Sequence, residues 1–340
     1  MYMIKKPFPF VLLCLLLLFT ASCNRRGQYI SLKGSALGTT YAITFRTPEE
    51  AQSGFSDIVE QTIASGFERI NNSLSIYNNH SLISRINRNL TQETDSLFRI
   101  VFNKSMDIYI LTHGAFDITS APFFDLWGFG LKKRDTSGQD SLELIRQYTG
   151  MDKFRLEGLS IYKEDPRSSL SMNAIAKGFA CDLIAKELLE LGITDMLVEI
   201  GGEVVCRGLN PKKKYWRIGI DSPVDGNIHP GRNIQAVITM TDKGLATSGN
   251  YRNYYIENGK KYAHIINPQT GLPVSHNLLS VTVIAPDCMT ADAFATAFMV
   301  MGLEASIGFL NQHPELGAYL IYDQGGVFKT FATDNITIEL

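Results

Sequence analysis

A carboxylate and a hydroxyl stand four residues apart in an otherwise apolar segment, 290–298. In a helix, positions i and i+4 share one face, so the oxygens of Asp292 and Thr296 would point to one spot. An ionised aspartate among alanines and phenylalanines is costly to bury unless it is paired or bound to a metal. Oxygen ligands suit Mg²⁺ or Ca²⁺ better than Zn²⁺. The segment indicates either a metal site or, alternatively, a helix capped by Asp292.

A second segment, 171–179, combines small residues with a lysine where a helix is expected to begin. Backbone amides at a helix N-terminus, together with the ammonium group of Lys177, suit a phosphate group. The alternative is an amphipathic helix in which Lys177 reaches solvent and Gly178 packs against a neighbouring element. The segment alone leaves both interpretations open.

A third group of polar residues lies in segments 246–252 and 264–271. The first places the hydroxyl of Ser248 and the guanidinium of Arg252 around a glycine turn. The second places His264 at a predicted strand end, and histidine is a side chain that can serve as a general base at neutral pH. A purely structural histidine is the alternative, and it is the expected role of His80, His113, His229, His276 and His313.

The elements that must position these residues follow from hydrophobic periodicity. A helical period predicts helices at about 51–75, 95–112, 173–191, 289–301 and 304–312. Short apolar runs between Gly, Asn and Pro predict strands at 41–45, 196–200, 215–220, 233–240, 251–256, 261–266 and 278–285, with a final pair after the last helix. Because long helices precede most strands without regular βαβ alternation, we expect an α+β fold, a mixed sheet core with flanking helices.

The N-terminus has the pattern of a signal peptide at residues 1–22. Two lysines precede an apolar run from Phe8 to Phe19, and small residues precede Cys23. The run is too short for a bilayer, which takes roughly 20 residues. A cysteine after small residues resembles a bacterial lipobox, so we expect lipidation at Cys23, with cleavage near Ala21 and ordinary secretion as the alternative. Residues 23–33 would then form a linker and 34–340 one domain of an extracytoplasmic, membrane-anchored lipoprotein that faces the periplasm.

Charge and cysteine content exclude several classes of partner and site. The 32 basic and 34 acidic residues nearly balance, which argues against binding to nucleic acid or to an anionic membrane surface. The cysteines of the expected domain are few, widely separated and without a C-x-x-C spacing, so we expect neither a disulfide framework nor a thiolate metal site: Cys181, Cys206 and Cys288.

Taken together, these segments resemble the ApbE family, the FAD:protein FMN transferases of bacterial flavin attachment. The resemblance runs from about Gly34 to the C-terminus. Any one piece is weak, but their order is specific: 36–39, 73–77, 114–119, Pro122, 126–130, 174–178, 199–203, 248–252, 264–271 and 291–296. Asn267 stands where the family usually has Asp, and Gln269 where it often has Arg.

The resemblance implies an ApbE-like fold and a set of site residues. Mg²⁺ would be held by Asp292, Thr296 and the backbone carbonyl of Ala174. FAD would contact six positions in separate segments: Leu37, Tyr77, Asp117, Lys177, His264 and Ile265. We add Ser248 and Arg252 of the glycine turn to these expected FAD contacts.

The implied reaction is Mg²⁺-dependent transfer of FMN from FAD to a Thr or Ser hydroxyl of an acceptor protein, with AMP released and His264 as the base. The family points to acceptors among extracytoplasmic subunits of membrane redox complexes and small flavin-binding domains. Two other functions fit the same residues. One is a Mg²⁺-dependent FAD pyrophosphatase that gives free FMN and AMP, and the other is a non-catalytic FAD-binding lipoprotein.

Overall fold

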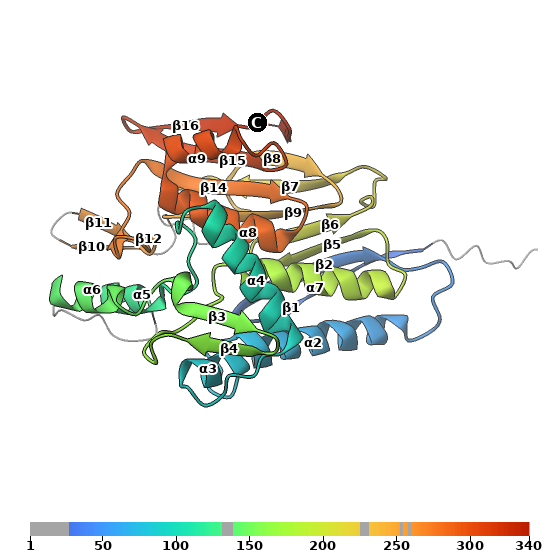
Figure 1. The fold of residues 1–340 in the computed structure, drawn as a ribbon. Helices are drawn as coiled ribbons and strands as arrows, with labels where there is room; N and C mark the ends of the chain where they lie inside the picture. The colour runs from blue at the N-terminus through green and yellow to red at the C-terminus, as the bar shows by residue number, and fades with distance from the viewer. Residues whose placement is uncertain (1–26, 131–138, 225–230, 252–253, 258–259, 340) are drawn as a thin grey trace, which may run out of the picture.

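The computed structural model describes residues 27–130, 139–224, 231–251, 254–257 and 260–339. The predicted signal peptide, Cys23 and Arg252 lie outside these described residues. At the centre is an antiparallel sheet of eight strands (Figure 1). In spatial order the strands are β1 (Tyr29–Ala36), β2 (Thr39–Arg46), β5 (Met196–Ile200), β6 (Glu203–Arg207), β9 (Lys243–Gly249), β14 (Leu278–Ala285), β15 (Gly317–Gln324) and β16 (Val327–Ala332).

Helices cover one face of this sheet, with α7 and α8 directly against it and α2 and α4 packed outside them (Figure 1). The helices are α2 (Phe55–Leu74), α3 (Leu82–Asn87), α4 (Ser96–Leu111), α5 (Ala121–Trp127), α6 (Gln139–Arg146), α7 (Ala176–Glu190), α8 (Cys288–Met301) and α9 (Leu303–Leu310), with a 3₁₀ turn η1 (Met151–Lys153). Helix α2 buries one apolar stripe that includes Val59, Ile63 and Ile70. Helix α8 is apolar on nearly all sides, as expected of a helix buried between other elements.

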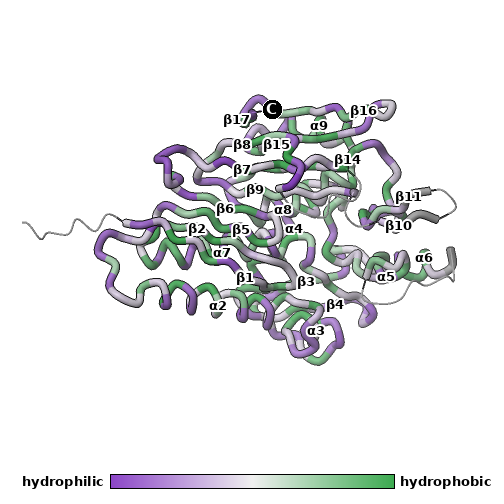
Figure 2. The backbone as a smooth tube through the Cα atoms, turned by 180° about the vertical axis from the view of Figure 1, so that it is seen from behind, coloured by the Kyte–Doolittle hydropathy of each residue, from purple (hydrophilic) through white to green (hydrophobic). Residues whose placement is uncertain are grey.

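A second sheet packs against the opposite face and is seen in front when the molecule is viewed from behind (Figure 2). Its strands lie in the order β17 (Thr337–Glu339), β8 (Ile234–Met240) and β7 (Trp216–Asp221). Trp216 and Ile238 pack against Leu245 and Tyr319 of the main sheet in a separate apolar cluster. Because both faces of β14 are covered, that strand is a nearly continuous apolar run rather than an alternating one.

Short hairpins complete the chain around one end of the sheet. They are β3 (Phe154–Glu157) with β4 (Ser160–Lys163), β10 (Tyr254–Glu257) with β11 (Lys260–Ala263), and β12 (Ile266–Asn267) with β13 (Leu272–Pro273). The strand register places the turn at Leu37 and Gly38, the turn at Gly201 and Gly202, and the end of β9 at the same end of the main sheet. The candidate site lies at this end.

The predicted α+β class is confirmed, and each predicted helix is present with small changes in its bounds. The predicted linker 23–33 is too long, because β1 begins at Tyr29 and pairs with β2. Helix α7 starts at Ala176 rather than near 173, since residues 173–175 form a turn. The strand predicted at 251–256 is shifted to β10, and the final strands number three rather than two.

Two further expectations concern the described part of the chain. Its three cysteines, Cys181, Cys206 and Cys288, are free and buried, as predicted from their spacing. Within the described ranges, no helix is both long enough and apolar enough to cross a membrane.

Candidate active site

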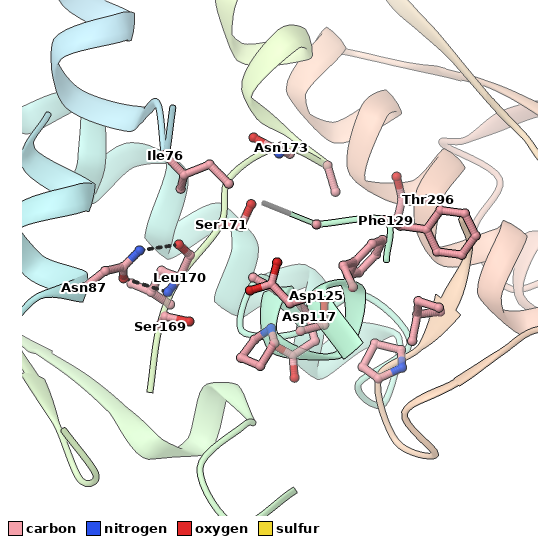
Figure 3. Close-up of a pocket in the computed structure, with 18 of the residues that line it drawn as sticks. Ile76, Asn87, Asp117, Asp125, Phe129, Ser169, Leu170, Ser171, Asn173 and Thr296 are labelled. Atoms are coloured by element: carbon pink, nitrogen blue, oxygen red, sulfur yellow. Dashed lines mark hydrogen bonds between the residues drawn. The ribbon is translucent and has the colours of Figure 1, made fainter. Parts of the chain in front are cut away.

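A cavity of about 440 Å³ opens between the start of α7, the region around α5 and one face of α8. Its volume falls within the ordinary range for a small-molecule site. Four of the predicted site residues, from four separate segments of the chain, line it: Tyr77, Asp117, Ala174 and Thr296. Figure 3 shows Asp117 and Thr296 among the lining side chains, with Ile76, Asn173 and Phe129 nearby. The fold therefore gathers residues up to 219 positions apart, from Tyr77 to Thr296, around one space.

Asp292 lies in the second turn of α8, where its side chain is only 4% exposed. Its Oδ2 accepts a hydrogen bond from the backbone N–H of Gly178 at 2.9 Å. The N-cap of α8 is Asp287, whose Oδ1 accepts from the Thr290 N–H at 2.7 Å. The alternative that Asp292 caps the helix is therefore wrong.

Thr296 follows Asp292 by one helical turn and lies beside the end of β9. Its Oγ1 is 3.4 Å from the Ser248 Oγ, so the two hydroxyls are within hydrogen-bonding reach. Thr296 shares the cavity wall with Ala174. The carboxylate, the two hydroxyls and the turn at Ala174 thus meet where α8 faces the start of α7.

Charged groups around Asp292 set its ionisation. Burial raises the pKa of Asp292 to about 7, although the Lys177 ammonium opposes this effect and the Glu203 carboxylate adds to it. Burial alone would lower the pKa of Lys177, but the charges of Glu203 and Asp292 raise it above its usual value. Within this cluster two carboxylates face one ammonium group. A bound cation would favour the ionised form of Asp292.

The structure shows the surroundings of Lys177 and Gly178, the two residues on which the interpretations of segment 171–179 differ. Lys177 does not extend freely into solvent, because its Nζ forms an ion pair with Glu203, a side chain that is 4% exposed. Gly178 does pack closely: a methyl group there would meet the carbonyl oxygen of Cys288 at 2.3 Å. The glycine allows α7 and α8 to approach at the level of Asp292.

Asp117 and Tyr77 form the wall and mouth of the cavity. The Thr119 N–H donates to Asp117 Oδ1 at 2.7 Å, which fixes the carboxylate after the glycine turn at 114. Burial raises the pKa of Asp117 to about 6, and its hydrogen bonds to Thr119 counteract part of that effect. The ring of Tyr77 is largely exposed at the mouth, where its hydroxyl accepts from Asn173 Nδ2 at 3.2 Å.

His264 lies in a bend between β11 and β12, behind the cavity wall rather than in it. Its ring meets that of Phe129 edge-on at 6.4 Å between centroids, and Phe129 lines the cavity. Phe129 also stacks with Tyr255, at 5.3 Å, and Tyr255 stacks with Tyr262. The aromatic series joins the β10–β11 hairpin to the cavity and holds the His264 ring next to its rim.

The remaining predicted residues lie outside the lining. Leu37 occupies the tight turn between β1 and β2 with φ of 52°, half-buried against the main core. Ile265 is buried in that core, while the next residue, Ile266, reaches the cavity. Lys177 and Ser248 lie one layer behind the wall, beside Asp292 and Thr296 respectively.

Several lining residues have no counterpart in the sequence prediction. Asn87 binds the backbone of Leu170 through both amide atoms, each at 2.8 Å, and so fixes the segment leading to Ser171 (Figure 3). Asp125 adds a second carboxylate next to Asp117 in the lining. Neither Asn87 nor Asp125 lies in a segment that the sequence analysis singled out, whereas Asn173 lies in segment 171–179.

Comparisons with known proteins identify the family of this chain. The family model described as "ApbE family" matches residues 37–320, which is most of the chain. The chain belongs to the ApbE family. Its fold class, predicted from the sequence, matches that of solved ApbE structures.

The alignments with relatives of this ApbE chain cover almost the whole length of both proteins. It is 36% identical over 331 residues to the FAD:protein FMN transferase of Vibrio cholerae, covering 94% of this chain and 95% of that protein. It is 33% identical to that of Haemophilus influenzae, with 96% of each chain covered. The solved flavin transferase ApbE from Vibrio cholerae aligns with a TM-score of 0.81 at 32% identity, over 91% of this chain and 98% of that one. The apo form of the flavinyl transferase ApbE from Pseudomonas stutzeri also aligns with a TM-score of 0.81, at 28% identity, over 91% of this chain and 96% of that one.

Proposed function

We propose that this enzyme transfers FMN from FAD to a Thr or Ser hydroxyl of an acceptor protein and releases AMP. Its full-length relatives are named FAD:protein FMN transferase. The observation that carries the proposal is the meeting of Tyr77, Asp117, Ala174 and Thr296 around one cavity. That cavity is large enough for an extended organic ligand, and Asp292 lies one helical turn before Thr296, which lines the cavity wall.

The oxygen atoms around Asp292 and Thr296 suit Mg²⁺. Asp292 provides one buried carboxylate, Thr296 a hydroxyl and Ala174 a backbone carbonyl, and hard divalent cations prefer such oxygen donors. The described residues contain no cluster of three or more His, Cys, Asp or Glu side chains suited to a metal. A site with one carboxylate and neutral oxygens agrees with Mg²⁺, which usually keeps several waters and binds substrate phosphates. When bound, Mg²⁺ would neutralise charge on the pyrophosphate and on the leaving phosphate of AMP.

The protein's own part in the reaction is mainly positioning and proton transfer. The acceptor hydroxyl oxygen forms a bond to the FMN phosphorus, and the bond from that phosphorus to the bridging oxygen breaks, so that AMP leaves. His264, held beside Phe129 at the rim, accepts the hydroxyl proton. Lys177 and Ser248 support the cluster around Asp292 and Thr296. Tyr77 and Asp117 in the cavity wall orient FAD for the transfer.

The location and partner belong to the same proposal. A lipid on Cys23 would attach the domain to the membrane from the extracytoplasmic side, through residues 24–28, which precede β1. Acceptors anchored in the same membrane would meet the cavity at high local concentration. We therefore propose a flavin-carrying subunit of a membrane redox complex as the partner.

The dependence of AMP release on an acceptor, together with the amount of free FMN, distinguishes transfer from hydrolysis. The enzyme is incubated with FAD and Mg²⁺, with and without an acceptor domain, and AMP and free FMN are measured. Transfer predicts AMP release that depends on the acceptor, with little free FMN. Rapid release of both FMN and AMP without acceptor would support a pyrophosphatase, and no AMP under either condition would support a binding protein.

A further inference from the structure

Asp182 of α7 lies against the first turn of α8 and has no role in the reaction described above. Its two carboxylate oxygens accept hydrogen bonds from successive backbone amides. Oδ1 accepts from Cys288 N at 2.9 Å and Oδ2 from Met289 N at 2.8 Å. Amides in the first turn have no partner within their own helix, and the helix dipole favours a carboxylate there. Asp182 therefore satisfies the start of α8 from a neighbouring helix.

The backbone of Cys288 is enclosed on two further sides by glycines. A methyl group at Gly178 of α7 would meet the Cys288 carbonyl oxygen at 2.3 Å, and one at Gly244 of β9 would meet the Cys288 nitrogen at 2.2 Å. Helix and strand thus approach this residue as closely as a backbone allows. Together with the two hydrogen bonds that Asp182 accepts, these contacts fix where α8 begins.

The start of α8 determines where its functional side chains point. Asp292 lies about one helical turn after Cys288, and Thr296 lies about two turns after it. A rotation of α8 by one residue, about 100°, would therefore turn both side chains away from α7. In the observed register, Asp292 Oδ2 accepts from Gly178 N and Thr296 lies in the cavity wall. The two α7 contacts, at Gly178 and Asp182, are also one helical turn apart. They form a matched pair that sets the rotation of α8 relative to α7.

Asp287 provides an internal comparison, because it stabilises the same helix through a hydrogen bond within its own turn. Its side chain accepts from the Thr290 N–H within its own turn and lies 3.8 Å from Lys104 of α4. Losing Asp287 would weaken the start of α8 but leave its hydrogen bonds to α7 in place.

We propose that Asp182 is a positioning residue for the Mg²⁺ site: by holding the amides of Cys288 and Met289, it sets the register in which Asp292 and Thr296 face Ala174. This inference rests on the proposed function, because it concerns the metal site of that reaction. Asp182 does not touch the cavity, so it acts only through α8.

The test compares Asp182→Asn with Asp287→Ala, using Mg²⁺ alone as the probe. Asparagine keeps the size of the side chain but turns an NH₂ group toward one of the two N–H donors. Thermal melting of the purified protein is followed across a Mg²⁺ series without FAD, since binding to the folded state raises the melting temperature. Transfer is then measured over the same series with FAD and acceptor.

We expect both variants to melt earlier than the parental protein in the absence of Mg²⁺. Only Asp182→Asn should require about 10-fold more Mg²⁺ for half of the melting shift, the scale typical of residues that orient metal ligands. The same increase should appear in transfer, with the plateau rate at saturating Mg²⁺ retained. Asp287→Ala should keep the parental Mg²⁺ dependence.

Two outcomes would overturn the inference in distinguishable ways. If Asp182→Asn keeps the parental Mg²⁺ dependence while Asp292→Ala loses it, the metal site stands and Asp182 does not position it. If Mg²⁺ leaves the melting of the parental protein unchanged, there is no such metal site, and the role of Asp182 disappears with it. Should Asp182→Asn fail to fold, Asp182→Glu, which keeps both acceptor oxygens, replaces it, and the same two outcomes apply.

Discussion

At the scale of single residues, the clearest agreement between sequence and structure concerns the positions of Asp292 and Thr296 on α8. Their spacing predicted a shared helix face, and the structure places both next to α7, with Asp292 buried and Thr296 in the cavity wall. The cap interpretation failed for a local reason: Asp287, five residues earlier, already accepts the Thr290 amide. Asp292 does not cap its own helix; one of its oxygens accepts the Gly178 amide in the first turn of α7, and its other oxygen is left for a metal.

The two residues should respond unequally to substitution, because Asp292 provides charge and Thr296 a neutral oxygen. Asp292→Ala should nearly abolish Mg²⁺-dependent transfer. Thr296→Ala should weaken metal binding and regain activity at higher Mg²⁺. Transfer rates measured against Mg²⁺ concentration, with a melting curve for each variant, test this. An unchanged Mg²⁺ response in Asp292→Ala would contradict the metal assignment.

His264→Ala should separate binding from catalysis. The ring lies behind Phe129 at the cavity rim, so its loss should leave most FAD affinity intact. Loss of a general base typically slows a reaction by about 10²–10⁴-fold. FAD binding by fluorescence and transfer rates under saturating FAD check the two parts. Transfer at the parental rate would mean that another group or water accepts the proton.

Asp117 should make the free energy of unfolding depend on pH. Burial raises its folded-state pKa from 3.8 to about 6, so between these values the folded protein binds more protons than the unfolded chain. Stability from this group is therefore present at low pH and is lost as pH rises from about 4 to about 6. Asp117→Asn, which can still accept from the Thr119 N–H, should flatten that slope by up to about 1 kcal/mol per pH unit. Denaturant unfolding across this range measures it, and parallel slopes would contradict the shift.

At the scale of elements, periodicity predicted the long helices and central strands because each buries a regular apolar face or run. It missed β1, β6 and β9, because the apolar runs in these strands are short, are interrupted by glycine or end in polar residues. It also missed α5, and although it predicted strands at 251–256 and 261–266, it did not predict the ring contacts of Phe129 with Tyr255 and His264. Such contacts depend on tertiary packing and leave no periodic signal.

The site residues also divide into those that the sequence indicates and those whose role appears only in the folded structure. Those with unusual local chemistry, such as an aspartate in an apolar helix or a lysine among small residues, were visible in the sequence. Asp182 and Glu203 were not recognised, because an acidic residue at those positions looks like any solvated charge. Their importance appears only when α7, α8 and the Gly201–Gly202 turn are assembled.

Gly178→Ala should disturb the contact between α7 and α8. The added methyl group would lie 2.3 Å from the Cys288 carbonyl oxygen and 2.8 Å from the Asp292 Cβ, and backbone cannot move aside cheaply. We expect a loss of about 1–3 kcal/mol in the free energy of unfolding. Gly308→Ala is the control: it lies within α9 with open space around it, so it should be neutral or stabilising by up to about 1 kcal/mol. Equal effects in the two variants would contradict close packing at Gly178.

At the scale of the whole molecule, the family model and the relatives extend across nearly the entire chain. The alignment with the Vibrio cholerae relative covers 94% of this chain and 95% of that protein. The cavity opens at one end of the sheet, among the turns and short hairpins, while the opposite sheet face is covered by β7, β8 and β17. The acceptor must approach from the open end.

The lipid anchor can be tested separately from the reaction. Cys23→Ser should abolish lipid modification and impair maturation of the precursor, because lipidation needs the thiol. Metabolic labelling with a fatty acid and membrane fractionation check this. Because β1 begins six residues after Cys23, the unmodified domain should still fold and transfer FMN in solution. Normal processing and unchanged membrane attachment in the variant would remove the lipoprotein proposal.

The central claim is that FMN becomes covalently attached to a hydroxyl of another protein. The direct measurement is mass spectrometry of a candidate acceptor domain after incubation with the enzyme, FAD and Mg²⁺. The account predicts one added FMN in phosphoester linkage on a single Thr or Ser, absent when that residue is changed to Ala or when Asp292→Ala replaces the parental enzyme. Conversion of FAD to FMN and AMP with every acceptor left at its original mass would contradict it.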